Sequence, residues 1–325
     1  MKYTNKQNLS LPIALWLTAD DYDRKPMEDC YGVTELLKSL RQIVLGRRVV
    51  QDDSIIESVD VSDCIEARIG QTIHSAIEDS VLNNYTGKLL ALGYPQAVID
   101  RVRINPNEPC EDAINIYTEG RTYKQLDTGD IVSGKYDFVI EGVVNDIKTT
   151  KCYQYTKNDF REKAVLQGSM YRWLDPDVIT EDHIYINWIF KDWAASQTFR
   201  DNYPKNQIVI SKLHLMSLGD TDRWVRSVLT LVKSYKDTPE PELPECNSTE
   251  LWRDAPVWKY YKDPAKLSRS TKNFANAHEA NLRLAKEGKG IVLEVKGTAK
   301  ACKYCNVFAI CTQKDKLIAS GDLVL

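Results

Sequence analysis

Two acids and a lysine lie close together near the middle of the chain. Asp137 comes nine residues before Asp146, and Lys148 follows Asp146 with one residue between them. In a strand, alternate residues share a face, so Asp146 and Lys148 should lie together while Ile147 points into the core. Two neighbouring carboxylates repel each other unless a cation joins them. The pattern therefore predicts a site for Mg²⁺ or Mn²⁺, which prefer oxygen ligands.

The residues around these three predict a β-hairpin. Residues 129–142 are rich in β-branched and aromatic side chains between glycines, which indicates one strand. Residues 143–149 indicate a second strand, reached through a tight Glu141-Gly142 turn. Across this hairpin Asp137 should meet Asp146. The alternative is an ordinary surface hairpin with an Asp/Lys pair, because such spacing is common by chance.

A helix is expected before the hairpin, over residues 62–84. Its expected buried stripe consists of Ile65, Ile69, Ile73, Ala76, Ile77 and Val81. His74 and Glu78 are four residues apart and share a face beside this stripe. Taken alone, such a histidine is more often a core or boundary residue than a ligand.

A second helix is expected after the hairpin, over residues 158–175, with Asn158 or Asp159 as its cap. Gln167 and Tyr171 are four residues apart on one face of this helix. They could lie beside the acids, or they could be a boundary pair with no part in chemistry. The tyrosines of residues 151–157, which have lysines close by, could stack on bases, but ordinary loop packing is the simpler interpretation.

The ordered set of motifs resembles the RecB-type branch of the PD-(D/E)XK nucleases, in particular phage-type members related to CRISPR-associated and AddB-like iron–sulfur exonucleases. The resemblance runs from Gly70-x-x-x-His74, through the Asp137 and Asp146-Ile147-Lys148 motifs, to the C-terminal cysteines. It implies that metal is bound by His74, Asp137, Asp146 and the carbonyl of Ile147. It also implies a catalytic set made of Asp137, Asp146, Lys148, Gln167 and Tyr171.

Three cysteines near the C-terminus, Cys302, Cys305 and Cys311, have a spacing that lets their thiolates converge. A cluster or a structural zinc needs four ligands. The family's early cysteine position corresponds here to Ser39, so Cys246, at the entrance to the terminal segment, is the predicted fourth ligand. The resemblance favours a [4Fe–4S] cluster over structural Zn²⁺. Reduced thiols without a metal remain the alternative.

Composition is typical of a soluble globular protein, with 43% hydrophobic and 27% charged residues among 325. No apolar run approaches the length of a membrane span, so a cytoplasmic protein is expected, in the host cytoplasm if a phage encodes it. Eight cysteines then favour free thiols or metal ligands over disulfides. Because the net charge is −3, any DNA contact must come from a local basic patch.

A Pro- and Glu-rich stretch over residues 238–246 predicts a linker. The expected domains are therefore a nuclease core over 1–237 and a linker with a metal- or cluster-binding lobe over 238–325. The expected fold is α/β, a restriction-endonuclease-like mixed sheet flanked by helices. Further expectations are a helix over 33–49, with Arg41 on a solvated or phosphate-contacting face, and hairpin strands within 113–126.

The predicted function is that of a metal-dependent deoxyribonuclease, an exonuclease in phage replication or recombination. Its expected partners are single-stranded or end-bearing duplex DNA and a helicase or recombination protein, with no membrane. Two alternatives stay open: a DNA-binding or scaffold protein of the same fold that does not cleave, and a zinc-binding structural protein.

Overall fold

The structure is a computed structural model that describes residues 2–19, 29–50, 58–157 and 160–324. The chain forms two compact units, Met1–Leu37 with Glu57–Leu229, and Lys38–Ile56 with Thr230–Leu325. This division differs from the boundary expected at residue 237, because residues 38–56 belong to the second unit. No helix of the described residues is long and apolar enough to cross a membrane.

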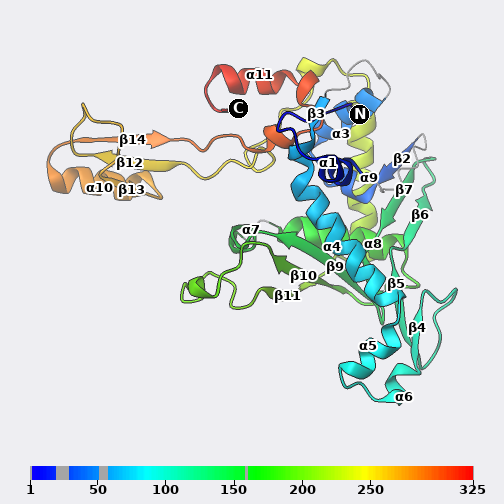
Figure 1. The fold of residues 1–325 in the computed structure, drawn as a ribbon. Coiled ribbons are helices and arrows are strands. Elements are labelled where there is room, and N and C mark those ends of the chain that lie inside the picture. The colour runs from blue at the N-terminus through cyan, green and yellow to red at the C-terminus, as the bar shows by residue number, and fades with distance from the viewer. Residues whose placement is uncertain (1, 20–28, 51–57, 158–159, 325) are drawn as a thin grey trace. The chain divides into compact units, whose positions relative to one another are not determined.

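The first unit is built on a six-stranded mixed sheet (Figure 1). Its strands, in spatial order, are β11 (Ile208–His214), β10 (His183–Phe190), β9 (Val143–Thr150), β8 (Phe138–Ile140), β5 (Ile114–Thr118) and β4 (Val102–Ile104). The pairs β9–β10 and β4–β5 are parallel, and the other neighbours are antiparallel. The expected mixed sheet is confirmed.

Two smaller sheets complete the strands of this unit. One joins β2 (Cys30–Gly32), β7 (Ile131–Lys135) and β6 (Arg121–Gln125), and the other pairs β1 (Lys2–Thr4) with β3 (Ser58–Asp60). The single strand expected over residues 129–142 is wrong. It is divided into β7 and β8, which belong to different sheets. The chain changes sheet at Tyr136 and Asp137, because the buried Tyr136 ring packs edge-on against Tyr171.

The strands expected within residues 113–126 exist as β5 and β6, but they do not form a hairpin with each other. β5 pairs with β4 and β8 in the large sheet, whereas β6 pairs with β7. The intervening turn contains Glu119 with a φ of 51° and then Gly120. A Cβ on Gly120 would collide with the Tyr136 ring, so this turn fits closely against the sheet change.

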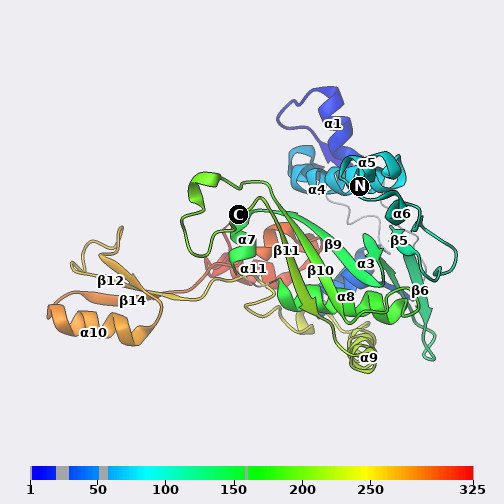
Figure 2. The same ribbon diagram turned by 90° about the horizontal axis from the view of Figure 1, so that it is seen from below.

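Helices flank the large sheet, as expected. In Figure 2, strands β9 to β11 lie between α4 (Ile65–Leu82) and α8 (Arg161–Leu174). The remaining helices with residues in this unit are α1 (Leu11–Thr18), α2 (Val33–Leu36), α5 (Tyr85–Ala91), α6 (Gln96–Ile99), α7 (Cys152–Lys157) and α9 (Leu218–Ser234). The 3₁₀ turns are Val61–Cys64 and Ala195–Gln197.

Two details of the expected helices need correction. The α4 stripe is half-buried at best, with Ile65 37% exposed, while Arg68 is the α4 residue that is buried. The caps expected for the second helix, Asn158 and Asp159, lie outside the described residues. The turn before α4 is capped by Asp60, whose carboxylate accepts a hydrogen bond from the backbone N–H of Ser62.

The helix expected over residues 33–49 is interrupted. It forms α2 and then α3 (Leu40–Val50), which belong to different units. Ser39 starts α3, because its Oγ accepts a hydrogen bond from the Gln42 N–H at 3.2 Å while the Gln42 side chain accepts from the Ser39 N–H. This reciprocal capping box gives the chain a new helix start at the change of unit.

The second unit contains α3 and two further parts. One part pairs β13 (Lys272–Phe274), β12 (Val257–Tyr261) and β14 (Ile291–Val295), with α10 (Ala277–Glu287) against them. The other part holds α11 (Thr312–Ala319) and the 3₁₀ turns Glu240–Glu242, Ala301–Tyr304 and Phe308–Ile310. Its buried core is Leu251, Ala299, Leu317 and Leu323. The cysteine-bearing C-terminal region expected from the sequence is thus present.

Two glycines should respond in opposite ways to alanine. A Cβ at Gly134, in β7, would lie 2.7 Å from Leu174 Cδ1 and 3.0 Å from a Tyr171 ring carbon. Gly134→Ala should therefore lower the free energy of unfolding by about 1–3 kcal/mol through overpacking. A Cβ at Gly70, in α4, meets nothing within 4 Å. Gly70→Ala should raise stability by about 0.5–1 kcal/mol, because alanine is the better helix former.

Urea denaturation followed by circular dichroism measures both changes. Equal effects of the two substitutions would contradict the packing described around Gly134.

Candidate active site

Asp137 lies where the chain passes from one sheet to the other. The β8–β9 hairpin turns at Glu141 and Gly142, whose φ values of 47° and 79° match a type I′ turn. Phe138 pairs with Asn145, and this register brings Asp137 opposite Asp146, as the sequence predicted. Asp137 Oδ2 accepts a hydrogen bond from the Ile147 N–H at 2.8 Å. The carboxylate is therefore fixed to the strand that carries the other acid.

His74 approaches the same carboxylate from α4. Its Nδ1 lies 3.4 Å from Asp137 Oδ1. Burial alone lowers the pKa of His74, but the hydrogen bond and charge of Asp137, with the charge of Asp146, outweigh it and raise the pKa above 6.5. Burial raises the pKa of the Asp137 carboxyl, but the hydrogen bond and charge of His74 outweigh it and lower this pKa. The contact with Asp137 therefore favours the protonated form of His74.

Asp146 and Lys148 form a close pair on β9. Lys148 Nζ donates a hydrogen bond to Asp146 Oδ1 at 2.9 Å and lies 2.8 Å from Oδ2. Oδ2 is buried and, among the described residues, receives no hydrogen bond of good geometry. Asp146 is 3% exposed, whereas the Lys148 side chain is 38% exposed. One carboxylate oxygen thus has the lysine near it but no donor directed at it.

Burial sets the electrostatics of this pair. Desolvation raises the pKa of Asp146, and repulsion by Asp137 adds to it, while Lys148 opposes both. Burial lowers the pKa of Lys148, but the neighbouring carboxylates outweigh it, so the ammonium form is favoured. A second positive charge beside Asp146 would relieve both the desolvation and the repulsion between the acids.

These residues fit a divalent cation by their chemistry. Two carboxylates lie across one hairpin, and one of their oxygens is buried without a directed donor. Within the described ranges, no three His, Cys, Asp or Glu side chains are already close enough together to hold a metal ion. His74 and Lys148 instead take the places of cations beside the two acids. Asp137, Asp146 and His74 are the side chains that could hold the metal.

Gln167 and Tyr171 support the point where the chain changes sheet. Gln167 Nε2 donates a hydrogen bond to the Tyr171 hydroxyl at 2.9 Å. Tyr171 is buried, and its ring meets the Tyr136 ring edge-on at 6.3 Å. Tyr136 directly precedes Asp137, so the pair on α8 positions the backbone that carries the first acid.

The predicted cysteine ligands lie in the second unit, next to the first turn of α3. Ser39 Oγ lies 3.2 Å from Cys246 Sγ. Arg41 Nε donates a hydrogen bond to Cys311 Sγ at 3.3 Å, and Gln42 Nε2 donates to Cys305 Sγ at 3.4 Å. Cys302 packs against the small core beside Cys246. None of these four cysteines forms a disulfide. Donors directed at sulfur suit the thiolates of a metal centre.

Cys246 is held in place by its backbone. The Gln313 side chain accepts from the Cys246 N–H at 2.8 Å and donates to the Cys246 carbonyl at 2.9 Å. Burial raises the pKa of the Cys246 thiol to about 11. Burial therefore favours the neutral thiol at Cys246, and a bound cation would have to offset this to hold the thiolate.

Arg41 is a residue whose role the sequence did not indicate. It was expected on a solvated or phosphate-contacting face, but it is 2% exposed. Its guanidinium donates to the Leu243 carbonyl at 2.8 Å and forms an ion pair with Glu240, besides its bond to Cys311. Its position off the apolar stripe was visible in the sequence, but its distant partners were not.

Comparisons with known proteins give no family assignment. No family model matches the chain, and no curated protein matches it. Among solved structures, the chain is similar to a crystal structure of SSO0001, with 15% identity and a TM-score of 0.42, over 69% of this chain and 87% of that one. It is also similar to a phage-related exonuclease from Haemophilus somnus 129PT, with 8% identity and a TM-score of 0.27, over 53% of this chain and 83% of that one.

Metal binding at this site should depend on pH through His74. A coordinating imidazole must be neutral, and the pKa of His74 is raised above 6.5. The affinity for Mn²⁺ should therefore fall as pH drops through that pKa, with about one proton released per ion bound. Isothermal titration calorimetry in buffers of different ionisation enthalpy measures both quantities.

His74→Ala should weaken Mn²⁺ binding about tenfold or more and remove this pH dependence. His214→Ala is the matched control, because the His214 side chain is 77% exposed on β11. An unchanged affinity and pH profile in His74→Ala would reject His74 as a ligand.

Proposed function

We propose that this protein is a metal-dependent deoxyribonuclease that hydrolyses phosphodiester bonds with Mg²⁺ or Mn²⁺. The main support is a hydrogen-bond network. In it, Asp137 accepts a hydrogen bond from the Ile147 N–H, and Asp146 accepts one from Lys148. Two acids and a lysine lie on one hairpin, and Asp146 Oδ2 has no hydrogen-bond donor directed at it among the described residues. This arrangement suits a cation and a phosphate together. An exonuclease acting on DNA ends in phage replication or recombination, in the host cytoplasm with a helicase or recombination partner, is the specific form proposed.

Each side chain has a defined part in this proposal. Asp137 and Asp146 hold the cation, with His74 and the Ile147 carbonyl as further ligands. The cation, when bound, polarises the phosphate and lowers the pKa of an attacking water. Lys148 keeps its ammonium form beside Asp146, so it can orient that water or stabilise negative charge on the phosphate. Gln167 and Tyr171 act as positioning residues behind Asp137.

We also propose that Cys246, Cys302, Cys305 and Cys311 hold a [4Fe–4S] cluster, with structural Zn²⁺ as the alternative. Three of these sulfurs are contacted by side chains of the first turn of α3. Cys246 and Cys302 also pack against the buried apolar cluster of Leu251, Ala299, Leu317 and Leu323. A metal centre would therefore join this cluster to α3 and add to the stability of this part of the chain.

Loss of either acid or of the lysine should abolish cleavage without unfolding the chain. Asp146→Ala should slow hydrolysis of linear DNA by about 10³-fold or more, and Lys148→Ala by about 10²–10³-fold. Because the residues act on one transition state, the losses should not add in Asp137→Ala/Asp146→Ala. Cleavage is measured with labelled single- and double-stranded DNA in Mg²⁺ or Mn²⁺.

Lys151→Ala is the control, because Lys151 lies just beyond β9 and its side chain is 60% exposed. If Asp146→Ala cleaves at the rate of the unaltered protein, the active-site assignment is wrong. If no metal supports cleavage by the unaltered protein, the nuclease proposal itself fails.

A serine–cysteine exchange tests the fourth cluster ligand. Cys246→Ser should lose iron and sulfide, because it removes one of four thiolates. Adding Ser39→Cys should restore them, since position 39 places its side-chain oxygen 3.2 Å from the Cys246 sulfur. Iron, sulfide and zinc are measured on protein purified without oxygen.

Cys110→Ser is the control, because Cys110 is exposed. Zinc without iron in the unaltered protein would reject the cluster and keep the site. Full iron in Cys246→Ser, or neither metal in the unaltered protein, would reject the proposed ligand set.

A further inference from the structure

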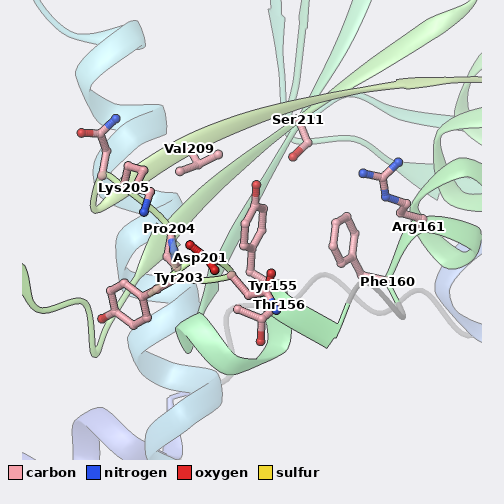
Figure 3. Close-up of a pocket in the computed structure, with 12 residues that line it drawn as sticks. Tyr155, Thr156, Phe160, Arg161, Asp201, Tyr203, Pro204, Lys205, Val209 and Ser211 are labelled. Atoms are coloured by element: carbon pink, nitrogen blue, oxygen red, sulfur yellow. The ribbon is translucent and has the colours of Figure 1, made fainter. Parts of the chain in front are cut away.

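A groove of about 610 Å³ opens beside the large sheet (Figure 3). Tyr155, Thr156, Phe160 and Arg161 line one side, and residues 201–206 with Val209 and Ser211 line the other. Tyr155 stands in the middle of the view, between Phe160 on one side and Val209 and Pro204 on the other. None of the residues assigned to the active site lines this groove.

The floor of the groove lies on the same sheet face as Asp146 and Lys148. In the strand register, Lys148 pairs with Trp188 and Trp188 pairs with Val209. The next row joins Asp146, Ile186 and Ser211 in the same way. Laterally paired residues point to one face, and neighbouring strands are about 4.8 Å apart. Val209 and Ser211 are therefore roughly 10 Å from the acid and lysine, on the same face.

Aromatic rings build the wall of the groove. Tyr155 and Phe160 are nearly parallel, with centroids 6.2 Å apart and an angle of 15°. Both rings meet Trp188 edge-on, at 5.5 Å and 4.2 Å. Trp188 is itself fixed, because its Nε1 donates a hydrogen bond to Ser211 Oγ at 3.0 Å. A rigid set of rings that lines an open groove is a suitable surface for a flat aromatic ligand.

The charged lining of the groove is mainly basic. Among its described lining residues, Arg161 and Lys205 are basic and Asp201 is the single acid. Lys205 Nζ donates a hydrogen bond to the Thr198 carbonyl at 2.6 Å. This contact anchors the loop of residues 201–206 on the side of the groove opposite Phe160. Aromatic faces beside guanidinium and ammonium groups suit a ligand that carries both a planar base and a phosphate.

We infer that this groove binds single-stranded DNA next to the scissile phosphate, with a base against Tyr155 and Phe160 and a phosphate near Arg161. The inference rests on the proposed nuclease function and extends it to the substrate strand. A separation of roughly 10 Å along one sheet face corresponds to a short stretch of nucleotides between groove and acids. The groove would therefore favour substrates whose strand is already unpaired near the cleavage point.

Binding measurements without divalent ions test the groove independently of cleavage. A short single-stranded oligonucleotide carries the fluorescent base 2-aminopurine at successive positions. When 2-aminopurine is the base that lies against Tyr155, binding to the unaltered protein should quench its fluorescence through stacking. Tyr155→Ala should remove the quenching and weaken binding about tenfold. Tyr153→Ala is the matched control, because Tyr153 is on the same helix, 56% exposed and outside the groove.

A charge change tests the groove without removing an aromatic ring. Arg161→Gln, in the first turn of α8, should weaken binding and reduce its salt dependence by about one phosphate contact. Arg172→Gln, in the last turn of the same helix, should do neither. Thermal unfolding of each variant shows whether it is folded.

The results separate the two proposals. Quenching that persists in Tyr155→Ala, or equal salt dependence for Arg161→Gln and Arg172→Gln, would overturn the groove assignment even if the protein cleaves DNA. Loss of quenching in Tyr155→Ala alone, in a protein that cleaves nothing, would keep the groove and reject the nuclease.

Discussion

The burial of the Asp146 carboxylate is the constraint on which the first unit depends. A carboxylate removed from water needs charge or hydrogen bonds on both oxygens, and Asp146 has a directed donor on only one. Lys148 is placed beside it by the alternation of β9, and Asp137 is placed opposite it by the β8–β9 register. The tight hairpin turn at Glu141 and Gly142 sets the register that brings the two acids together.

The histidine–aspartate contact has the same physical basis. His74 and Lys148 each place a positive charge against one acid, so the two carboxylates are balanced in the absence of a metal. In the proposed function, such a balance would let the site exchange a proton for a divalent ion. With a metal bound, His74 would become a ligand and Lys148 a contact to the phosphate.

The second unit meets a different constraint around its cysteines, which lie beside the buried cluster of Leu251, Ala299, Leu317 and Leu323. Its order depends on polar contacts to buried groups, chiefly Arg41 with Glu240 and Leu243, and Gln313 with the backbone of Cys246. Removing one partner of a buried ion pair typically costs about 3–5 kcal/mol, so these contacts matter more than their number indicates. The first turn of α3 combines this support with contacts to three cysteine sulfurs, which links the sulfur geometry to the folding of this unit.

The sequence alone determined the pieces that depend on short spacing: the β8–β9 hairpin with Asp137 opposite Asp146, the shared face of Asp146 and Lys148, and the helical faces of His74, Gln167 and Tyr171. Only the tertiary structure decided where the chain changes sheet at Tyr136, because strand propensity is continuous from β7 to β8 and packing against Tyr171 breaks it. It likewise decided that Arg41 is buried against Cys311, and that Tyr155, Phe160 and Val209 share one groove. Partners that are 50 to 270 residues apart leave no periodic signal in the sequence, since only folding brings them into contact.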